Sequence, residues 1–326
     1  MQRWTADTPV LADDRRPVPE RALIPARLVA SYAACRELHR VYGRTYYLAT
    51  RMLPAWKRPH VHALYGFARY ADNLVDCHEP ACDEPGCDEP GRAERLAAWT
   101  RRIAAALDGE PTRDPILPAL VHTVDVFGLD RADLDAFLRS MAMDLTVRTY
   151  DTYRDLLVYM AGSAAAIGSL MLPILGADDL AAAAEPARQL GLAFQLTNFI
   201  RDIREDAGLG RIYLPTQDLA EFGVSAGDLR AGRLTGEVRA LIAFEVLRAQ
   251  SHYARAAAGI PMLHPSSQGC VRAAYLVYGG ILDEVVRAGY DVFSRRLAVP
   301  TRRRLTLAAT ALLTPPGRPV ATLPGS

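Results

Sequence analysis

The sequence carries almost no net charge and few cysteines. Its 326 residues include 38 Lys and Arg against 37 Asp and Glu, a balance that gives no support to a nucleic-acid partner. The five cysteines are an odd number and do not form the framework of a small secreted protein. The N-terminal stretch is rich in Arg, Asp and Pro and contains no secretory signal. These features together predict a cytoplasmic protein.

Alternating apolar and polar residues, the pattern of β-strands, are also missing. Helical periodicity instead runs from about Ile24 to Leu312, and the chain is 50% hydrophobic but only 8% aromatic, which suits packed helices. We predict an all-α protein with one domain over residues 24–313 and poorly ordered ends at residues 1–23 and 314–326. One helix is expected between Pro59 and Pro80, and others at residues 92–108, 115–127, 131–147, 152–172, 180–206, 237–258 and 267–296.

One long stretch, from Leu156 to Ala177, has no charged residue and is long enough to span a bilayer. Small residues dilute its hydrophobicity, Pro173 interrupts it, and Asp155 and Asp178 bracket it. We therefore predict a buried helix whose small residues leave room for a ligand. A membrane span is the alternative, supported by length alone.

Three cysteines, Cys77, Cys82 and Cys87, recur at a regular spacing around a repeated Cys-Asp-Glu-Pro-Gly motif. This spacing matches no usual zinc site. The prolines also prevent a helix from continuing through the segment. We favour a surface loop over a thiolate metal site.

The most informative pattern consists of two acidic pairs, Asp72 with Asp76 and Asp202 with Asp206. Residues four apart lie on one face of a helix, so each pair directs two carboxylates the same way. Like charges at this spacing are destabilising, which predicts a positive charge between them. Oxygen ligands without nearby His or Cys favour Mg²⁺, which binds one or two carboxylates together with substrate phosphates and water.

A single pair of this kind is common on solvated helix faces and is weak evidence for a metal site. Here, however, the neighbouring residues are apolar, among them Leu74 and Val75 in the first segment and Phe199 and Ile203 in the second. Asn198 extends the second acidic face back by one turn, and Gln195 lies on a neighbouring edge. The sequence therefore predicts a magnesium diphosphate held between two facing helices.

Several further motifs accompany the acidic pairs, in an order that resembles the squalene and phytoene synthases. They are residues 43–54 (GRTYYLATRMLP), residues 143–145 (MDL), residues 208–215 (GLGRIYLP) and residues 278–285 (YGGILDEV). The resemblance covers nearly the whole predicted domain, and among family members it is strongest to actinobacterial phytoene synthases. It implies the all-α isoprenoid synthase fold, with a central cavity for prenyl diphosphates.

The resemblance also implies roles for individual residues. Two to three Mg²⁺ ions are expected to bind Asp72, Asp76, Asn198, Asp202 and Asp206, with Gln195 assisting. Residues matching positions that contact diphosphate are Arg44, Thr45, Tyr65, Arg69, Arg201, Arg211, Tyr278 and Arg295. Arginine suits this task because its planar fork of donors matches phosphate oxygens.

The implied chemistry begins when the metal ions neutralise the diphosphate leaving group and the allylic C–O bond ionises to a carbocation. Apolar and aromatic walls exclude water and stabilise the cation, with Tyr46 as a candidate wall residue. The double bond of a second prenyl diphosphate then attacks. The resulting cyclopropyl diphosphate rearranges and loses a proton, which gives phytoene from two geranylgeranyl diphosphates.

Some positions depart from the family pattern. Ala161 replaces a larger Tyr or His, Gly279 stands where phytoene synthases usually carry Arg, and Tyr42 replaces a common His. These changes leave ionisation intact but alter the site for the second substrate. They keep open the transfer of one prenyl group to an aromatic acceptor, with Ala161 lining the acceptor site, and also squalene or dehydrosqualene formation. A peripheral membrane contact is expected because the hydrocarbon product must leave into lipid.

Overall fold

The computed structural model describes residues 22–76 and 89–320. The cysteine repeat after Cys77, residues 1–21 and residues 321–326 lie outside the described part of the chain. The surface-loop prediction for the repeat therefore stays a prediction. So does the division into one domain and two ends, although the main core cluster includes residues from Ala22 to Val320.

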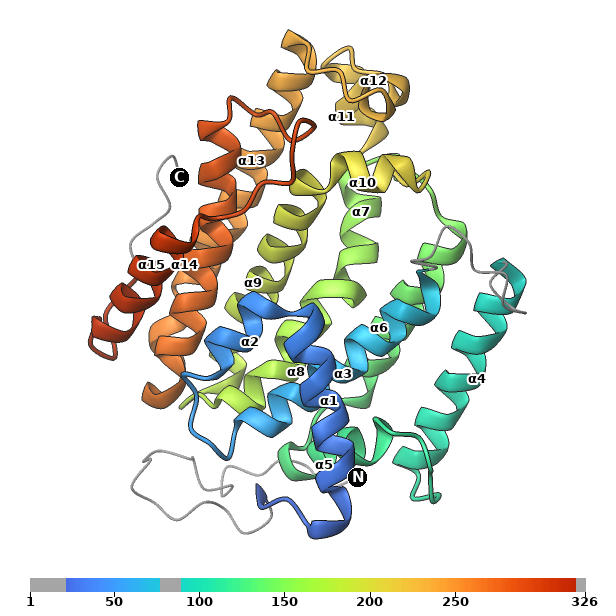
Figure 1. Ribbon diagram of the computed structural model, residues 1–326, viewed down its shortest axis with the longest axis vertical. Helices are drawn as coiled ribbons and strands as arrows, with labels where there is room; N and C mark the ends of the chain where they lie inside the picture. Colours follow the sequence, from blue (N-terminus) through green and yellow to red (C-terminus); the bar gives the residue numbers. More distant parts are fainter. Residues whose placement is uncertain (1–21, 77–88, 321–326) are drawn as a thin grey trace.

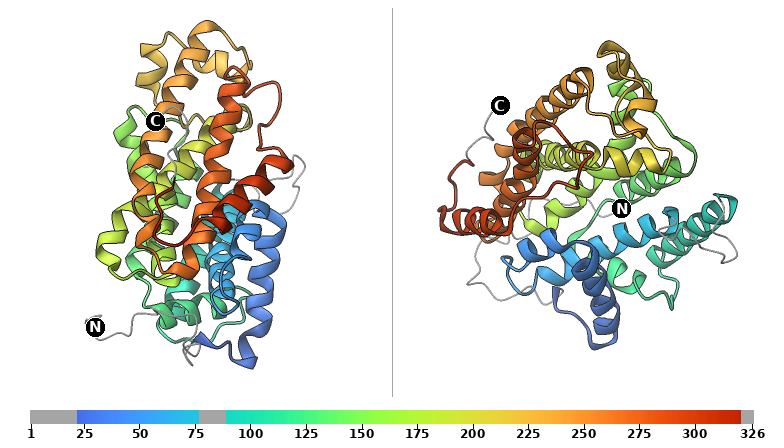
Figure 2. Two further views of the ribbon diagram at one scale, coloured as in Figure 1. Left: turned by 90° about the vertical axis from the view of Figure 1, so that its left-hand side faces the viewer. Right: turned by 45° about the horizontal axis from the view of Figure 1, so that its top comes forward.

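The described chain is a bundle of helices, and the all-α prediction is confirmed (Figures 1 and 2). Its only extended pairings within residues 22–76 and 89–320 are two isolated bridges, Thr149 with Ile212 and Ala177 with Leu263. The α-helices are α1 (Val29–Tyr42), α2 (Arg44–Thr50), α3 (Arg58–Val75), α4 (Glu89–Leu107), α5 (Leu117–Phe127), α6 (Arg131–Thr146), α7 (Tyr153–Met160), α8 (Ala166–Leu175), α9 (Leu180–Arg201), α10 (Ile203–Gly208), α11 (Thr216–Glu221), α12 (Ala226–Arg230), α13 (Gly236–Ala257), α14 (Pro265–Arg287) and α15 (Thr301–Leu313). Short 3₁₀ turns cover Ala26–Leu28 and Ile260–Met262.

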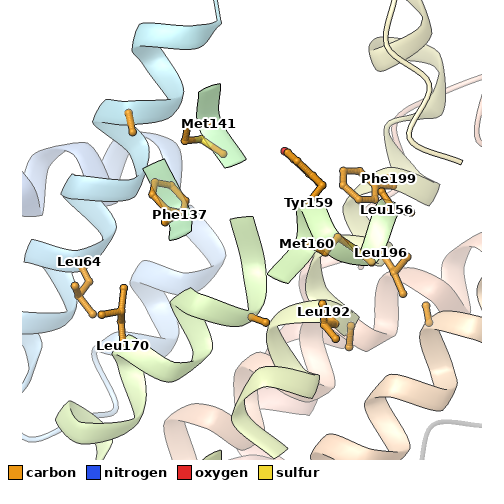
Figure 3. Close-up of a cluster of buried hydrophobic side chains, with 14 of the residues drawn as sticks. Leu64, Phe137, Met141, Leu156, Tyr159, Met160, Leu170, Leu192, Leu196 and Phe199 are labelled. Atoms are coloured by element: carbon orange, nitrogen blue, oxygen red, sulfur yellow. The ribbon is translucent and has the colours of Figure 1, made fainter. Parts of the chain in front are cut away.

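Helix α9 is at the centre of the bundle, packed against α8, α13 and α14. Helix α3 lies across from it and packs against α1, α5 and α6, whereas α4 lies at the periphery (Figure 1). The two predicted acidic segments end α3 and α9, so this arrangement brings them to the same part of the bundle. Figure 3 shows part of the apolar packing within the bundle, with Leu64 of α3 directed at Leu170 of α8.

Side-chain caps explain where several helices start. Asp130 accepts a hydrogen bond from the Ala132 N–H at the start of α6, and Thr235 accepts one from Val238 at the start of α13. Thr152 and Asp155 form a reciprocal capping box at the start of α7. These short polar residues satisfy backbone N–H groups that have no partner within the helix.

Several predicted helices have different boundaries in the structure. The predicted helix at 180–206 is interrupted at Asp202, whose φ of −103° and ψ of 13° separate α9 from α10. The predicted helix at 267–296 ends earlier, at Arg287, where Gly289 and Tyr290 adopt positive φ. Pro173 does not interrupt its segment, because it lies in the last turn of α8 before Gly176.

The long uncharged stretch forms α7, a π-helical turn at Ala161–Ala165, and α8. By length and composition Tyr153–Leu175 resembles a membrane span, but half of its apolar window is buried inside the bundle. Glycines let its backbone approach its neighbours closely. An added Cβ at Gly162 would lie 2.2 Å from the Ala136 carbonyl oxygen, and one at Gly168 would lie 2.3 Å from that of Ala187. The segment is therefore built as an internal wall of the bundle, as the buried-helix prediction requires.

A buried ionic cluster joins α13 to α11. Arg248 donates hydrogen bonds to Glu245 at 2.7 Å and to Asp218 at 2.6 Å, and its guanidinium lies 4.1 Å from the centre of the Tyr153 ring. The Glu245 side chain is fully buried. Burial raises the pKa of Glu245 to about 8, and nearby Asp218 adds to this effect while Arg248 opposes it. The folded protein therefore holds a proton that the unfolded chain releases near its ordinary pKa of 4.5.

This proton makes folding stability depend on pH in a defined direction. Because the folded state binds it more tightly, the contribution of Glu245 to the free energy of unfolding falls as pH rises from 4.5 to about 8. We predict that Glu245→Gln removes this contribution. Urea unfolding at pH 5.5 and at pH 7.5 measures this effect. The free energy of unfolding of the variant minus that of the original protein should be roughly 1–2 kcal/mol larger at pH 7.5 than at pH 5.5. A constant difference between the two proteins at both pH values would contradict the prediction.

Candidate active site

A hollow region between the ends of α3 and α9 consists of two adjoining cavities that share lining residues. The outer part, here called the mouth, has a volume of about 920 Å³ and is lined by charged and polar residues. The inner part, here called the chamber, has a volume of about 340 Å³. Residues that line both parts form the junction; they are Tyr46, Tyr65, Ala68, Ser163, Gln195 and Asn198.

All four predicted aspartates line the mouth. Asp72 lies in the last turn of α3, and Asp76 caps that helix in an extended conformation rather than continuing it. Asp202 lies at the break between α9 and α10, and Asp206 lies within α10. The backbone N–H of each second aspartate still bonds to the carbonyl of the first, at 2.9 Å in both pairs, so the expected spacing is kept despite the two helix ends.

Arginines supply the positive charge that these pairs require. Arg69 donates to Asp72 at 2.6 Å and Arg211 donates to Asp76 at 2.7 Å. Asp202 accepts hydrogen bonds from Arg201, its neighbour in sequence, and from Arg296 at 3.1 Å.

Asp206 differs from the other three aspartates. Among the described residues no hydrogen bond or ion pair reaches its carboxylate. Burial raises the pKa of Asp206 to about 8, and the negative charge of Asp202 raises it further. Asp206 thus lacks the arginine partner that the other three aspartates have, and a divalent cation with oxygen ligands fits beside it. No three His, Cys, Asp or Glu side chains within the described ranges are grouped closely enough to hold such an ion alone.

An amide and an aromatic cluster complete the junction. Tyr278 of α14 donates a 2.6 Å hydrogen bond to Asn198, whose amide in turn lies 3.5 Å from Gln195. The Tyr278 ring stacks on Tyr46 with ring centres 4.9 Å apart, and Phe194 lies against both rings. These rings place electron-rich faces directly beneath the charged mouth.

Asp144 of α6 also lines the mouth, although the sequence analysis gave it no role. Its carboxylate accepts hydrogen bonds from Tyr159 at 2.7 Å and from Tyr213 at 3.0 Å, and its carbonyl accepts one from Arg211. Burial raises the pKa of Asp144 to about 6, against the lowering effect of Tyr159 and Arg211. The signal in the sequence was the motif at residues 143–145, which contributed to the family resemblance without a role for Asp144 itself.

The remaining predicted residues divide into two groups. Arg44, Thr45 and Tyr65 line the mouth as expected. Arg295 is exposed and lines neither part of the cavity, since its neighbour Arg296 occupies the position facing Asp202. Ala161 also lines neither part, because the π-helical turn brings Ser163 to the junction instead.

The chamber below the junction is apolar. None of the described residues that line it is an acid, lysine or arginine. Its walls come from the α7–α8 segment, from α9 and from α14, with Met171, Leu190 and Val271 among them. A charged mouth that leads into an uncharged chamber can bind a molecule with an anionic head and a long hydrocarbon tail.

Comparison with known proteins agrees with this architecture. The sequence matches the squalene/phytoene synthase family over residues 39–303. The chain belongs to this family. It is 35% identical to a 15-cis-phytoene synthase of Synechococcus elongatus, over 90% of this chain and 96% of that protein. It is also 35% identical to a phytoene synthase of Arthrospira platensis, over 89% and 94% of the two chains.

Solved structures of this synthase family have the same fold. A dehydrosqualene synthase in complex with a ligand superposes with a TM-score of 0.78 at 27% identity, covering 86% of this chain and 95% of its own. A squalene synthase of Alicyclobacillus acidocaldarius gives 0.72 at 30% identity, covering 82% and 97%. The isoprenoid synthase fold expected from the resemblance is thus confirmed, and this synthase is a prenyltransferase-type enzyme.

The Arg211 bridge generates a prediction about the synthase without ligands. Arg211→Met leaves Asp76 without its arginine in a half-buried site, and we expect a loss of about 2 kcal/mol in the free energy of unfolding. Arg40→Met is the matched control. It removes an arginine from an exposed pair with Glu37 and should change stability by less than about 0.5 kcal/mol. Equal effects in urea unfolding would show that the Arg211 bridge does not stabilise the mouth.

Proposed function

We propose that this synthase joins two geranylgeranyl diphosphates head to head in a Mg²⁺-dependent reaction and releases phytoene. The observation that carries the proposal is that a mouth lined by four aspartates adjoins a chamber lined by no described acid, lysine or arginine. The names of its relatives support the same product. Diphosphate would lie in the mouth and the prenyl chains in the chamber.

The residues of the mouth divide this work between them. Asp72, Asp76, Asp202 and Asp206, with Asn198, would hold two to three Mg²⁺ ions, and the bound ions would stabilise the departing diphosphate. Arginines already positioned beside the carboxylates would donate hydrogen bonds to the phosphate oxygens; they are Arg69, Arg201, Arg211 and Arg296. Arg44, Thr45 and Tyr65 line the same space and can add donors, whereas exposed Arg295 is dropped from this set.

The aromatic cluster at the junction would act on the carbocation. Tyr46, Phe194 and Tyr278 lie between the diphosphate region and the chamber, where the ionised carbon would be left. Their ring faces attract positive charge, and their packing excludes water that would otherwise capture the cation.

Two other products remain alternatives. Transfer of one prenyl group to an aromatic acceptor relied on space beside Ala161, and Ala161 does not line the cavity. Dehydrosqualene formation uses the same chemistry on a shorter prenyl chain, whereas squalene formation replaces the last proton loss with hydride transfer from a nicotinamide reductant; two structural relatives carry these names. Product analysis with both chain lengths separates these possibilities.

The test is to incubate purified protein with Mg²⁺ and geranylgeranyl diphosphate alone, and in parallel with farnesyl diphosphate. We expect phytoene from the longer substrate and two diphosphates released for each hydrocarbon formed. Asp72→Ala and Asp202→Ala should each reduce diphosphate release at least a hundredfold while far-UV circular dichroism stays unchanged. Diphosphate binding without any hydrocarbon product would refute the head-to-head reaction and favour an aromatic acceptor. Near-normal turnover in either variant would remove the metal assignment.

We also propose that the synthase contacts anionic lipid surfaces through α15. Leu305, Leu312 and Leu313 are 68%, 63% and 82% exposed, and helical spacing places them with Ala309 on one face. Exposed Arg302 lies one turn before Leu305 on that face, and the helix contains no acidic residue. The opposite face of α15 places Leu307 against the cluster that contains Tyr278. A basic helix with exposed leucines suits an anionic membrane better than a second, equally basic copy of itself.

Sedimentation with lipid vesicles tests this contact. We expect the protein to bind vesicles that contain phosphatidylglycerol and to bind pure phosphatidylcholine vesicles at least several-fold more weakly. Leu312→Ser combined with Leu313→Ser should abolish this binding, whereas Leu247→Ser, on a 58% exposed leucine of α13, should not. Equal binding by all variants, or loss of dimers in light scattering instead of vesicle binding, would overturn the proposal.

A further inference from the structure

The chamber runs along two helices that pack side by side, α8 and α9 (Figure 1). On α9 the residues that line it recur every three or four positions from Ala183 to Asn198, so they form one continuous face of that helix. In the same way a continuous face lines it from Ser163, in the π-helical turn, to Leu175 at the end of α8. Asn198 and Ser163 both belong to the junction. Positions along these helices therefore measure depth below the junction.

The depth of the chamber follows from the rise of an α-helix. Asn198 and Ala183 are fifteen residues apart, which at about 1.5 Å per residue gives a depth of about 22 Å along α9. Ser163 and Leu175 are twelve residues apart, which gives about 18 Å along the other wall.

Main-chain contacts hold the far end of the chamber in place. Helix α8 ends at Leu175, and the following Gly176 has a φ of 77°, a conformation that glycine adopts readily. Ala177 then pairs with Leu263 in an antiparallel bridge, and the His264 N–H donates to the Gly176 carbonyl oxygen at 2.8 Å. Leu175 and Leu263 are both buried and both line the chamber. These two leucines are here called the end wall.

A buried lysine reinforces the end wall. Lys57 is 0% exposed, and its Nζ donates to the Leu175 carbonyl oxygen at 2.7 Å and to the Ser267 hydroxyl at 2.9 Å. The Ser267 hydroxyl donates to the same carbonyl oxygen at 2.6 Å. A cation at the C-terminal end of α8 also interacts favourably with the helix dipole. Because Lys57 caps α3 and Ser267 lies in α14, three helices together fix the position of the end wall.

Prenyl chains of different lengths can be compared with this depth. An extended chain advances about 1.2 Å per covalent bond, as the polypeptide backbone does. The sixteen main-chain carbons of a geranylgeranyl group then span about 18 Å, the twelve of a farnesyl group about 13 Å, and the twenty of a group with five isoprene units about 23 Å. Measured from the junction, the geranylgeranyl chain reaches the end wall and the farnesyl chain stops about one helical turn short of it. The five-unit chain is longer than either wall.

We propose that the end wall limits the prenyl chain beside α9 to four isoprene units, and that Ala187 contacts the fourth unit. This inference rests on the proposed function, because it takes the ligand to be a prenyl diphosphate. Ala187 lines the chamber eleven residues before Asn198, about 16 Å below the junction. This depth lies between the ends of the farnesyl and geranylgeranyl chains. The small alanine side chain leaves the space that the fourth unit needs, whereas a larger one would occupy it.

The experiment measures binding rather than turnover. Prenyl thiodiphosphates with three, four and five isoprene units, whose carbon–sulfur bond does not ionise readily, are titrated into the protein with Mg²⁺ by isothermal calorimetry. The original protein should bind the four-unit compound at least tenfold more tightly than either of the others. A difference of a single methylene group in an apolar pocket already changes discrimination by about tenfold or more.

Ala187→Leu fills the deepest turn of the chamber. It should weaken binding of the four-unit compound at least tenfold and change that of the three-unit compound by less than about threefold. Ala181→Leu is the matched control, since it makes the same change at an exposed position in the first turn of α9 and should leave all three affinities unchanged. Leu263→Ala removes part of the end wall and should tighten binding of the five-unit compound at least tenfold. Circular dichroism shows whether each variant is folded.

Equal affinity of the original protein for all three compounds would overturn the proposal. An unchanged preference in Ala187→Leu would also overturn it, and so would a folded Leu263→Ala without any gain for the five-unit compound. The two hypotheses fail differently. Protein that shows this length dependence but makes no hydrocarbon refutes the proposed function alone, whereas phytoene formation with length-independent binding refutes only the limit set by the end wall.

Discussion

Negative charge at the entrance of an apolar chamber is the constraint on which the rest of the structure depends. Four partly exposed aspartates line one mouth, and arginines from several elements pair with three of them. Arg211 illustrates the arrangement, since it follows α10 and yet bonds to Asp76 at the end of α3. The same bonds that stabilise the ligand-free mouth place donors where a diphosphate would need them. Stability and binding therefore use the same side chains.

The sequence predicted the fold and most of the mouth because both depend on local spacing. Helical periodicity gave the all-α bundle, and the acidic pairs with Asn198 lie in one cavity, as their spacing indicated. The predictions were wrong at positions whose conformation depends on contacts with residues distant in sequence. The break at Asp202, the position of Arg296 instead of Arg295, and the turn that replaces Ala161 with Ser163 follow from tertiary packing. Asp144 was missed because its tyrosine partners, Tyr159 and Tyr213, are distant in sequence.

The chamber shows how a bundle of helices can enclose an apolar cavity. Its wall on one side is the α7–α8 segment, where glycines allow backbones to approach within contact distance. The π-helical turn in that segment redirects the side chains at the junction, a common use of such turns near functional sites. Two of these close approaches, Gly168 with Ala187 and Gly191 with Ala164, are between residues that line the chamber.

The same wall has a consequence for how the protein must be made. Helices α6 and α9 cover the α7–α8 segment in the folded protein. Before they do so, this long apolar segment is exposed, and exposed apolar segments promote aggregation and membrane insertion. Its partner α9 follows it in the chain, so the segment leaves the ribosome before its cover exists. A chain truncated before α9 should therefore leave the apolar face of this segment uncovered.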